Sequence, residues 1–106
     1  MDALPEIVTT HLDEVRALCE KYSVKRLTIF GSAVKGTFDP KRSDLDFVVE
    51  FEWHPDPSER GRRWLDLWEE LKDLFGRNID LIVASTIENP FIAQAIRQAH
   101  LDLYAA

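Results

Sequence analysis

Three aspartates are spaced so that their side chains could gather around a metal ion. Asp44 and Asp46 are two residues apart in a stretch of alternating apolar and polar residues, so both should leave one face of a strand, roughly 7 Å apart along it. Asp80 lies in a later stretch of the same kind. If the two strands are neighbours, Asp80 comes within several ångströms of Asp46. Carboxylates this close repel one another unless a cation lies among them, and oxygen ligands with room left for phosphate oxygens favour Mg²⁺.

A glycine and a serine upstream of the aspartates favour phosphate as the group that such a metal would meet. Gly31 and Ser32 directly follow an expected strand and precede an expected helical turn. Glycine lets the backbone approach a ligand closely, and the amides of Ser32 and Ala33 can donate to phosphate oxygens at a helix start. The plainer interpretations are that Ser32 only caps the turn and that the three aspartates are solvated on an open sheet face. A phosphate-binding turn followed by a carboxylate pair is typical of nucleotide chemistry.

The elements that must hold these residues in place follow from hydrophobic periodicity. Steps of three and four residues between apolar positions predict helices, and alternation predicts strands. In chain order the expected elements are a helix over 5–22, a strand over 25–30, a strand over 44–51, a helix capped by Ser58 and stopped by Gly76, a strand over 78–84, a helix over 89–99, and a short strand or helix end over 101–104. The expected fold is α/β (α+β), a small mixed β-sheet with helices on one face and the carboxylates on the other.

The expected core draws on two strands and one long helix. Its members are Leu45, Phe47, Ile79, Leu81, Trp64, Trp68 and Phe75. The helix that carries Trp64, Trp68 and Phe75 has more large apolar side chains than are needed to cover one small sheet. The alternative to core packing is therefore that some of these aromatic side chains are exposed and contact a partner. Cys19 lies on the apolar stripe of the first helix and is expected to be a packing residue. The three histidines, His11, His54 and His100, show no metal-ligand spacing, and no role is assigned to them.

Length and charge exclude several classes of protein. The chain has 106 residues, which fits a single domain over residues 1–106. It carries 13 Lys and Arg against 19 Asp and Glu, a net charge of −6, which argues against duplex nucleic acid as a partner. No apolar run approaches the roughly 20 residues of a membrane span, and the first residues lack the basic-then-apolar order of a signal peptide. We therefore expect a cytoplasmic domain without a membrane partner.

Three segments together carry a family resemblance. They are Gly31 to Gly36 (GSAVKG), Ser43 to Val49 (SDLDFVV) and Asn78 to Val83 (NIDLIV). Each motif alone is weak, but the combination resembles the minimal nucleotidyltransferase (MNT) family of the DNA polymerase β-like superfamily, over nearly the whole chain. The resemblance implies a polymerase β-like nucleotidyltransferase fold. It also implies a metal-dependent transfer of AMP from ATP to a hydroxyl, with pyrophosphate as the leaving group.

The resemblance assigns roles to the residues of these segments. The nucleotide-binding residues would be Gly31, Ser32 and Lys35. Asp44 and Asp46 would bind the Mg²⁺ that grips the triphosphate, and Asp80 would join Asp46 at a second Mg²⁺ and help to deprotonate the attacking hydroxyl. The three aspartates are thus implied both as metal ligands and as catalytic residues.

This sequence departs from the family at two positions and in one spacing. Family members often have arginine where this chain has Ala33 and Lys35, and Lys35 keeps the charge without the planar fork. The loop between Ser32 and Asp44 is one residue longer than in the family's antitoxin motif, which is a cheap change. These departures bear on rate and nucleotide preference more than on the fold. The basic residues near the expected loops are interpreted as ordinary surface charge, with the alternatives that they offset a triphosphate or face an acidic partner: Lys35, Lys41, Arg42, Arg60, Arg62 and Arg63.

The resemblance also implies a partner. Stand-alone MNT domains pair with HEPN-domain ribonucleases and act as antitoxins, by adenylylating a tyrosine of the toxin or by binding it. A HEPN-domain toxin is therefore the implied partner. Two other interpretations stay open: a catalytically weak binding module that neutralises a partner by occlusion, and a small-molecule nucleotidyltransferase. The second would need an oligomer or another chain to build its acceptor pocket, and a homo- or hetero-oligomer is compatible with each interpretation.

Overall fold

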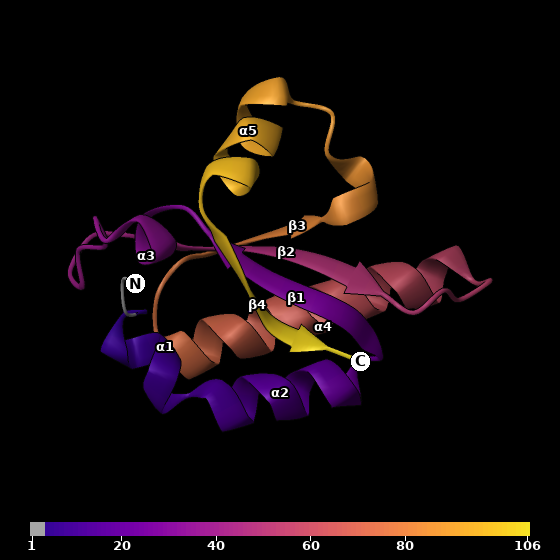
Figure 1. Ribbon diagram of the computed structural model, residues 1–106. Helices are drawn as coiled ribbons and strands as arrows, with labels where there is room; N and C mark the ends of the chain where they lie inside the picture. Colours follow the sequence, from indigo (N-terminus) through magenta and orange to yellow (C-terminus); the bar gives the residue numbers. More distant parts are fainter. Residues whose placement is uncertain (1–3) are drawn as a thin grey trace.

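Four strands in the order β3-β2-β1-β4 form a mixed sheet in the computed structural model, which describes residues 4–106 (Figure 1). The strands are β1 (Val24–Phe30), β2 (Leu45–Phe51), β3 (Ile79–Val83) and β4 (His100–Ala105). β1 runs antiparallel to both of its neighbours, β2 and β4, whereas β2 and β3 are parallel. The predicted mixed sheet is confirmed, and the segment over 101–104 is a strand rather than the end of a helix.

Three helices cover one face of this sheet: α1 (Glu6–Thr10), α2 (Leu12–Lys21) and α4 (Pro57–Phe75) (Figure 1). Burying the apolar faces of strands and helices against each other stabilises the fold. The buried cluster consists of Val8, Val15, Cys19, Val24, Leu27, Ile29, Ala33, Leu45, Phe47, Val49, Leu67, Leu71, Phe75, Ile79, Leu81 and Leu103. The predicted fold class is confirmed, and so is the packing role of Cys19. No helix among residues 4–106 has the length and apolar content to cross a membrane.

The other face of the sheet is less open than the sequence predicts. The 3₁₀ turn η1 (Ala84–Thr86) and the helix α5 (Pro90–Gln98) lie on this side, opposite α2 and α4 (Figure 1). Asn89 and Pro90 open α5 as predicted: Asn89 is the N-cap, and its side chain accepts a hydrogen bond from the amide of Phe91. Phe30 and Val48 point to this face and are buried. The prediction that all helices lie on one face is therefore wrong for α5, although α5 buries none of its own residues.

Two helix boundaries differ from the prediction. The first helix is not continuous over 5–22, because the backbone of His11 leaves helical geometry between α1 and α2. The His11 ring donates from Nδ1 to the carbonyl of Ile7 at 2.7 Å and meets the Phe75 ring edge-on, so tertiary packing fixes the break. The cap of α4 is Asp56, which accepts from the amide of Ser58, so Ser58 is not the cap. Gly76 ends α4 in a left-handed conformation, as predicted.

Two stacked tryptophans close the free edge of β3. The carbonyl of Asn78 accepts from β2, so by alternation the carbonyls of Ile79 and Leu81 point away from the sheet. Trp64 Nε1 donates to Leu81 O at 2.9 Å and Trp68 Nε1 donates to Ile79 O at 2.8 Å. The two indole rings are half-buried and stack with centroids 6.2 Å apart. They pack against the buried core, as predicted, and they also cover a sheet edge that would otherwise be free to pair, which the sequence does not predict.

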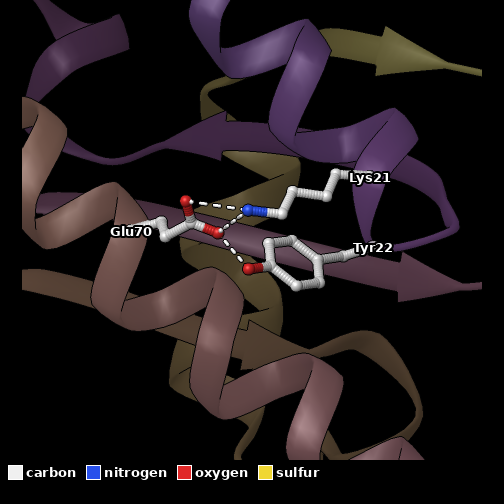
Figure 2. Close-up of polar contacts among 3 residues, drawn as sticks. All are labelled: Lys21, Tyr22 and Glu70. Carbon is white, nitrogen blue, oxygen red and sulfur yellow. Dashed lines mark hydrogen bonds and ion pairs between the residues drawn. The ribbon is translucent and has the colours of Figure 1, made fainter.

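A polar contact joins the two longest helices on the far side of the sheet from α5. Figure 2 shows Lys21 and Tyr22, at the end of α2, both pointing toward the Glu70 carboxylate of α4. The Tyr22 hydroxyl donates to Glu70 Oε2, and Lys21 Nζ lies 3.1 Å from the same oxygen. The hydrogen bond from Tyr22, with further help from Lys21, lowers the pKa of Glu70. This contact ties α2 to α4 at the surface of the core.

Candidate active site

Asp46 and Asp80 are direct neighbours in the sheet. They are register partners on the parallel strands β2 and β3, so their side chains leave the same face side by side. Asp46 is half-buried, whereas Asp80 is exposed. Burial, a hydrogen bond shared with Asp80 and the negative charges of Asp80 and Asp44 raise the pKa of Asp46 to about 7. A carboxylate pair of this kind needs either a proton or a cation between its members.

Gly31 lies directly against the Asp46 carboxylate. β1 ends at Phe30, which is the register partner of Asp46, and Gly31 follows with φ of +78°. A Cβ atom built on Gly31 would lie 2.5 Å from Asp46 Oδ2. The positive φ therefore favours glycine here, and any side chain at this position would also displace the Asp46 carboxylate. The turn that leaves β1 is thereby placed against the carboxylate pair.

The predicted phosphate-binding turn is the short helix α3 (Ser32–Lys35). The amides of Val34 and Lys35 both donate to the carbonyl of Gly31, at 3.0 Å, and Gly36 closes the turn with φ of +83°. The amides of Ser32 and Ala33 lie in the first turn and have no acceptor inside the helix. Ser32 is half-buried and Lys35 is exposed. The structure therefore places the predicted nucleotide-binding segment next to Asp46.

Asp44 is less closely associated with the pair. It precedes β2, is exposed, and its charge contributes to the raised pKa of Asp46. Among residues 4–106, no three His, Cys, Asp or Glu side chains are grouped so that they could hold a metal ion by themselves. Mg²⁺ is commonly held by one or two carboxylates, with water and phosphate oxygens completing its shell. The Asp46 and Asp80 pair fits such an ion, with Asp44 as a nearby negative charge.

Two residues around the site are not indicated by the sequence analysis. His100, to which no role was assigned, lies in the same register row as Asp46, on the far side of Phe30. Its Nδ1 donates to the carbonyl of Ile96 at 2.7 Å, which fixes the ring against the end of α5. Arg77 contacts the loop that leads into Asp44. The only feature of the sequence that could indicate a role for Arg77 is its position directly before a predicted strand, and this is a weak signal.

A pocket of about 870 Å³ lies at the opposite end of the parallel strands from Asp46. Its walls include Val49 and Phe51 at the end of β2, Val83 at the end of β3, and Trp64 and Gly61 of α4. None of the six predicted site residues lines it. The candidate active site is therefore the carboxylate pair with the glycine turn, and it is separate from this pocket.

Comparison with known sequences gives a consistent result. Residues 15–103 match the family described as the nucleotidyltransferase domain. A Methanocaldococcus jannaschii protein that is provisionally named a protein adenylyltransferase is 34% identical over 98 residues, covering 92% of this chain and 95% of its own. The protein adenylyltransferase MntA of Thermococcus cleftensis is 29% identical over 98 residues, covering 92% of this chain and 91% of its own.

Comparison with solved structures concerns the fold. A structure described provisionally as a minimal nucleotidyltransferase superimposes with a TM-score of 0.65 at 24% identity, covering 91% of this chain and 92% of its own. A toxin–antitoxin structure with AMP-PNP gives a TM-score of 0.67 at 18% identity, covering 90% and 73%. A complex of tri-AMPylated Shewanella oneidensis HEPN toxin with an MNT antitoxin gives a TM-score of 0.58 at 16% identity, covering 92% and 72%. The predicted likeness to minimal nucleotidyltransferases is confirmed.

Proposed function

The chain belongs to the nucleotidyltransferase domain family, and on that premise we propose that it is a protein adenylyltransferase that moves AMP from ATP to a tyrosine hydroxyl of a HEPN-domain toxin. In this role it acts as the antitoxin of a toxin–antitoxin pair. The observation that carries the proposal is the pairing of Asp46 with Asp80 directly beside Gly31. This arrangement sets a carboxylate pair against a turn that a phosphate chain can approach.

The proposed reaction is a single displacement at phosphorus. The acceptor oxygen bonds to the α-phosphorus of ATP, the bond from that phosphorus to the bridging oxygen of the β-phosphate breaks, and pyrophosphate leaves with the electron pair. The acceptor proton passes to a carboxylate, for which exposed Asp80 is the proposed base. The amides of Ser32 and Ala33, the Ser32 hydroxyl and the Lys35 ammonium would hold the β- and γ-phosphates. Positioning and charge neutralisation would supply most of the rate.

Asp46 and Asp80 are the residues that would hold Mg²⁺, and Asp44 is proposed as a further ligand from the family resemblance alone. When bound, Mg²⁺ neutralises triphosphate charge and favours loss of the acceptor proton. Two ions are proposed from the family resemblance, with Asp46 shared between them. The raised pKa of Asp46 supports a cation at this position, because a carboxylate that keeps its proton to about pH 7 is one whose negative charge lacks a partner.

The acceptor is proposed from the relatives. Named relatives are protein adenylyltransferases, and two fold neighbours are toxin–antitoxin complexes, one of them with an AMPylated HEPN toxin. The proposed partner is therefore a HEPN-domain protein of the same genome, and the proposed location is the cytoplasm.

The test is transfer of label from α-³²P-ATP to the purified HEPN partner with Mg²⁺. Wild type should label the partner, and Asp46→Asn and Asp80→Asn should each reduce the rate at least a hundredfold. Asp73→Asn, an exposed aspartate on α4, is the matched control and should leave the rate unchanged. Equal labelling by wild type and the two site variants would overturn the proposal. An unlabelled partner that still loses its toxicity in complex with both site variants would favour neutralisation by occlusion.

A further inference from the structure

Arg77 connects the two halves of the carboxylate site from outside it. It lies between Gly76, which ends α4, and the start of β3. Its Nη1 donates to the carbonyl of Ser43 at 3.1 Å and its Nη2 donates to the carbonyl of Pro40 at 2.8 Å. The guanidinium also lies over the ring of Phe38, 4.9 Å from its centroid. One side chain thus makes three contacts with the loop that joins α3 to β2.

That loop, residues 37–43, is a compact turn organised around Asp39. Asp39 N donates to Ser43 Oγ at 2.8 Å, and Ser43 N donates to Asp39 O at 2.9 Å. Asp39 Oδ1 also accepts from the amide of Lys41 at 2.9 Å. These bonds define the shape of the turn but do not connect it to the rest of the domain. The loop is connected to the domain by Phe38, which packs against the core, by the amide of Thr37, which donates to Ser32 O at 3.2 Å, and by the two carbonyls that Arg77 bonds.

The position of this contact in the chain links it to the candidate active site. Asp44 directly follows Ser43, and Asp80 lies three residues after Arg77. Next to the contact, Leu45 N donates to Asn78 O at 3.3 Å, where β2 and β3 begin to pair. The same guanidinium therefore fixes the entry into both strands that carry the carboxylates. Leu45 holds Asp44 from one side, because it is buried and paired with Asn78, so a loop free of Arg77 would leave Asp44 held from that side alone.

We propose that Arg77 is a positioning residue for the nucleotidyltransferase site, which acts through Asp44 by fixing the 37–43 loop to the start of β3. The inference rests on the proposed function for its catalytic meaning. Arginine suits this role because its planar fork reaches two carbonyls at once and stacks on an aromatic ring. The two Nη groups of Arg77 make its hydrogen bonds to the loop. Its Nε is buried and has no hydrogen-bond partner among the described residues. A lysine ammonium cannot reproduce the fork and the stacking together.

Limited proteolysis tests the contact itself, without metal or nucleotide. Lys41 and Arg42 are exposed trypsin sites inside the loop. Arg77→Ala should raise the rate of cleavage after these two residues at least tenfold, and Arg77→Lys should give an intermediate rate. Arg62→Ala, an exposed arginine on α4, is the control and should cleave like wild type. A loop cleaved at the wild-type rate in folded Arg77→Ala would overturn the proposal.

Binding of Mg²⁺-ATP, followed by calorimetry, tests the link to Asp44. Arg77→Ala should weaken binding about tenfold, and Asp44→Asn should weaken it by a similar factor. The variant with both changes should bind Mg²⁺-ATP no more weakly than the single variant that has the lower affinity, because both changes remove the same interaction. Independent, multiplying losses would show that Arg77 does not act through Asp44. If wild type itself fails to bind Mg²⁺-ATP, the proposed function fails, whereas wild-type binding with unchanged Arg77→Ala binding overturns only this inference.

Discussion

The backbone of Gly31 is in contact with the carboxylate of Asp46, so that a Cβ atom on Gly31 would lie 2.5 Å from Asp46 Oδ2. This contact joins the end of β1 to the strand that carries the carboxylate pair. It leaves no room for a side chain, and the φ of +78° at Gly31 independently disfavours one. The closeness of turn and carboxylate is what allows one phosphate chain to meet both.

The first prediction is that Gly31→Ala damages stability and nucleotide binding together. The new methyl group must displace the Asp46 carboxylate or the turn, and the positive φ adds strain, so we expect a loss of about 1–3 kcal/mol in the free energy of unfolding. Mg²⁺-ATP binding should fall at least tenfold. Thermal unfolding and calorimetry measure the two effects.

Gly61→Ala is the matched control for this variant. Gly61 lies inside α4, and a Cβ built on it meets nothing within 4 Å. Alanine has a higher helix propensity, so this change should stabilise the protein by about 0.5–1 kcal/mol and leave nucleotide binding unchanged. A Gly31→Ala variant that binds Mg²⁺-ATP like wild type would show that the contact with Asp46 does not shape the site.

The second prediction concerns Asp46 and pH. Its pKa is raised to about 7 in the folded chain from an ordinary value of 3.8, first by burial and then by Asp80. Folding therefore takes up a proton between these values, so the contribution of the group to stability is full below about pH 4 and is lost as the pH rises through about 7. Asp46→Asn keeps the shape without the charge. It should raise Tm by about 5 °C at pH 8, for a gain of about 1 kcal/mol after allowing for partial solvent exposure.

The same variant should have little effect on Tm at pH 4, where Asp46 of the folded wild type already holds its proton. Thermal unfolding between pH 4 and pH 8, in buffer without divalent cations, measures the difference. Asp102→Asn offers a comparison on the same face of the sheet as Asp46. Asp102 accepts a hydrogen bond from the Thr28 hydroxyl at 2.7 Å, so removing its charge should destabilise the protein. A pH-independent effect of Asp46→Asn would contradict the prediction.

The sequence predicts much of this arrangement because local patterns carry it. Alternation in β2 and β3 places the aspartates opposite the buried residues Leu45 and Leu81, and the structure agrees. The neighbouring position of Asp46 and Asp80 was predicted only on the condition that their strands pair. That condition is met through the parallel β2-α4-β3 unit. The functional roles of these residues remain predictions.

The features that the sequence does not predict all depend on contacts between distant segments. At the break, His11 contacts Phe75, which is far along the chain. The contact of Arg77 with the 37–43 loop needs two carbonyls whose direction no side-chain pattern reports. Likewise, the apolar stripe of α4 shows that Trp64 and Trp68 are on one face, but not that their indole N–H groups meet the edge of β3.

The third prediction is that Trp68→Phe weakens the protected edge of β3. Phenylalanine keeps an aromatic ring but cannot donate to Ile79 O, so the loss should be about 1 kcal/mol. The freed carbonyl also makes the edge more available for pairing with another chain. Thermal unfolding and light scattering at rising protein concentration measure the two effects. Trp53→Phe is the control, since Trp53 is 78% exposed; an identical response of the two variants would contradict the role of the indole N–H.

The fourth prediction concerns the Glu70 carboxylate, which Tyr22 and Lys21 both contact (Figure 2). The hydrogen bond from Tyr22 and the help of Lys21 lower its pKa, so its contribution to stability is present above the ordinary pKa of 4.5 and is lost as the pH falls through the folded-state value. The contact is at the surface, so Glu70→Gln should cost only about 0.5–1 kcal/mol at pH 7, a fall in Tm of about 3–5 °C. Near pH 2 the two proteins should unfold at the same temperature. Glu69→Gln, an exposed neighbour on α4, should match wild type at both pH values, and a Glu70→Gln effect that persists undiminished at pH 2 would show that packing rather than charge accounts for the loss.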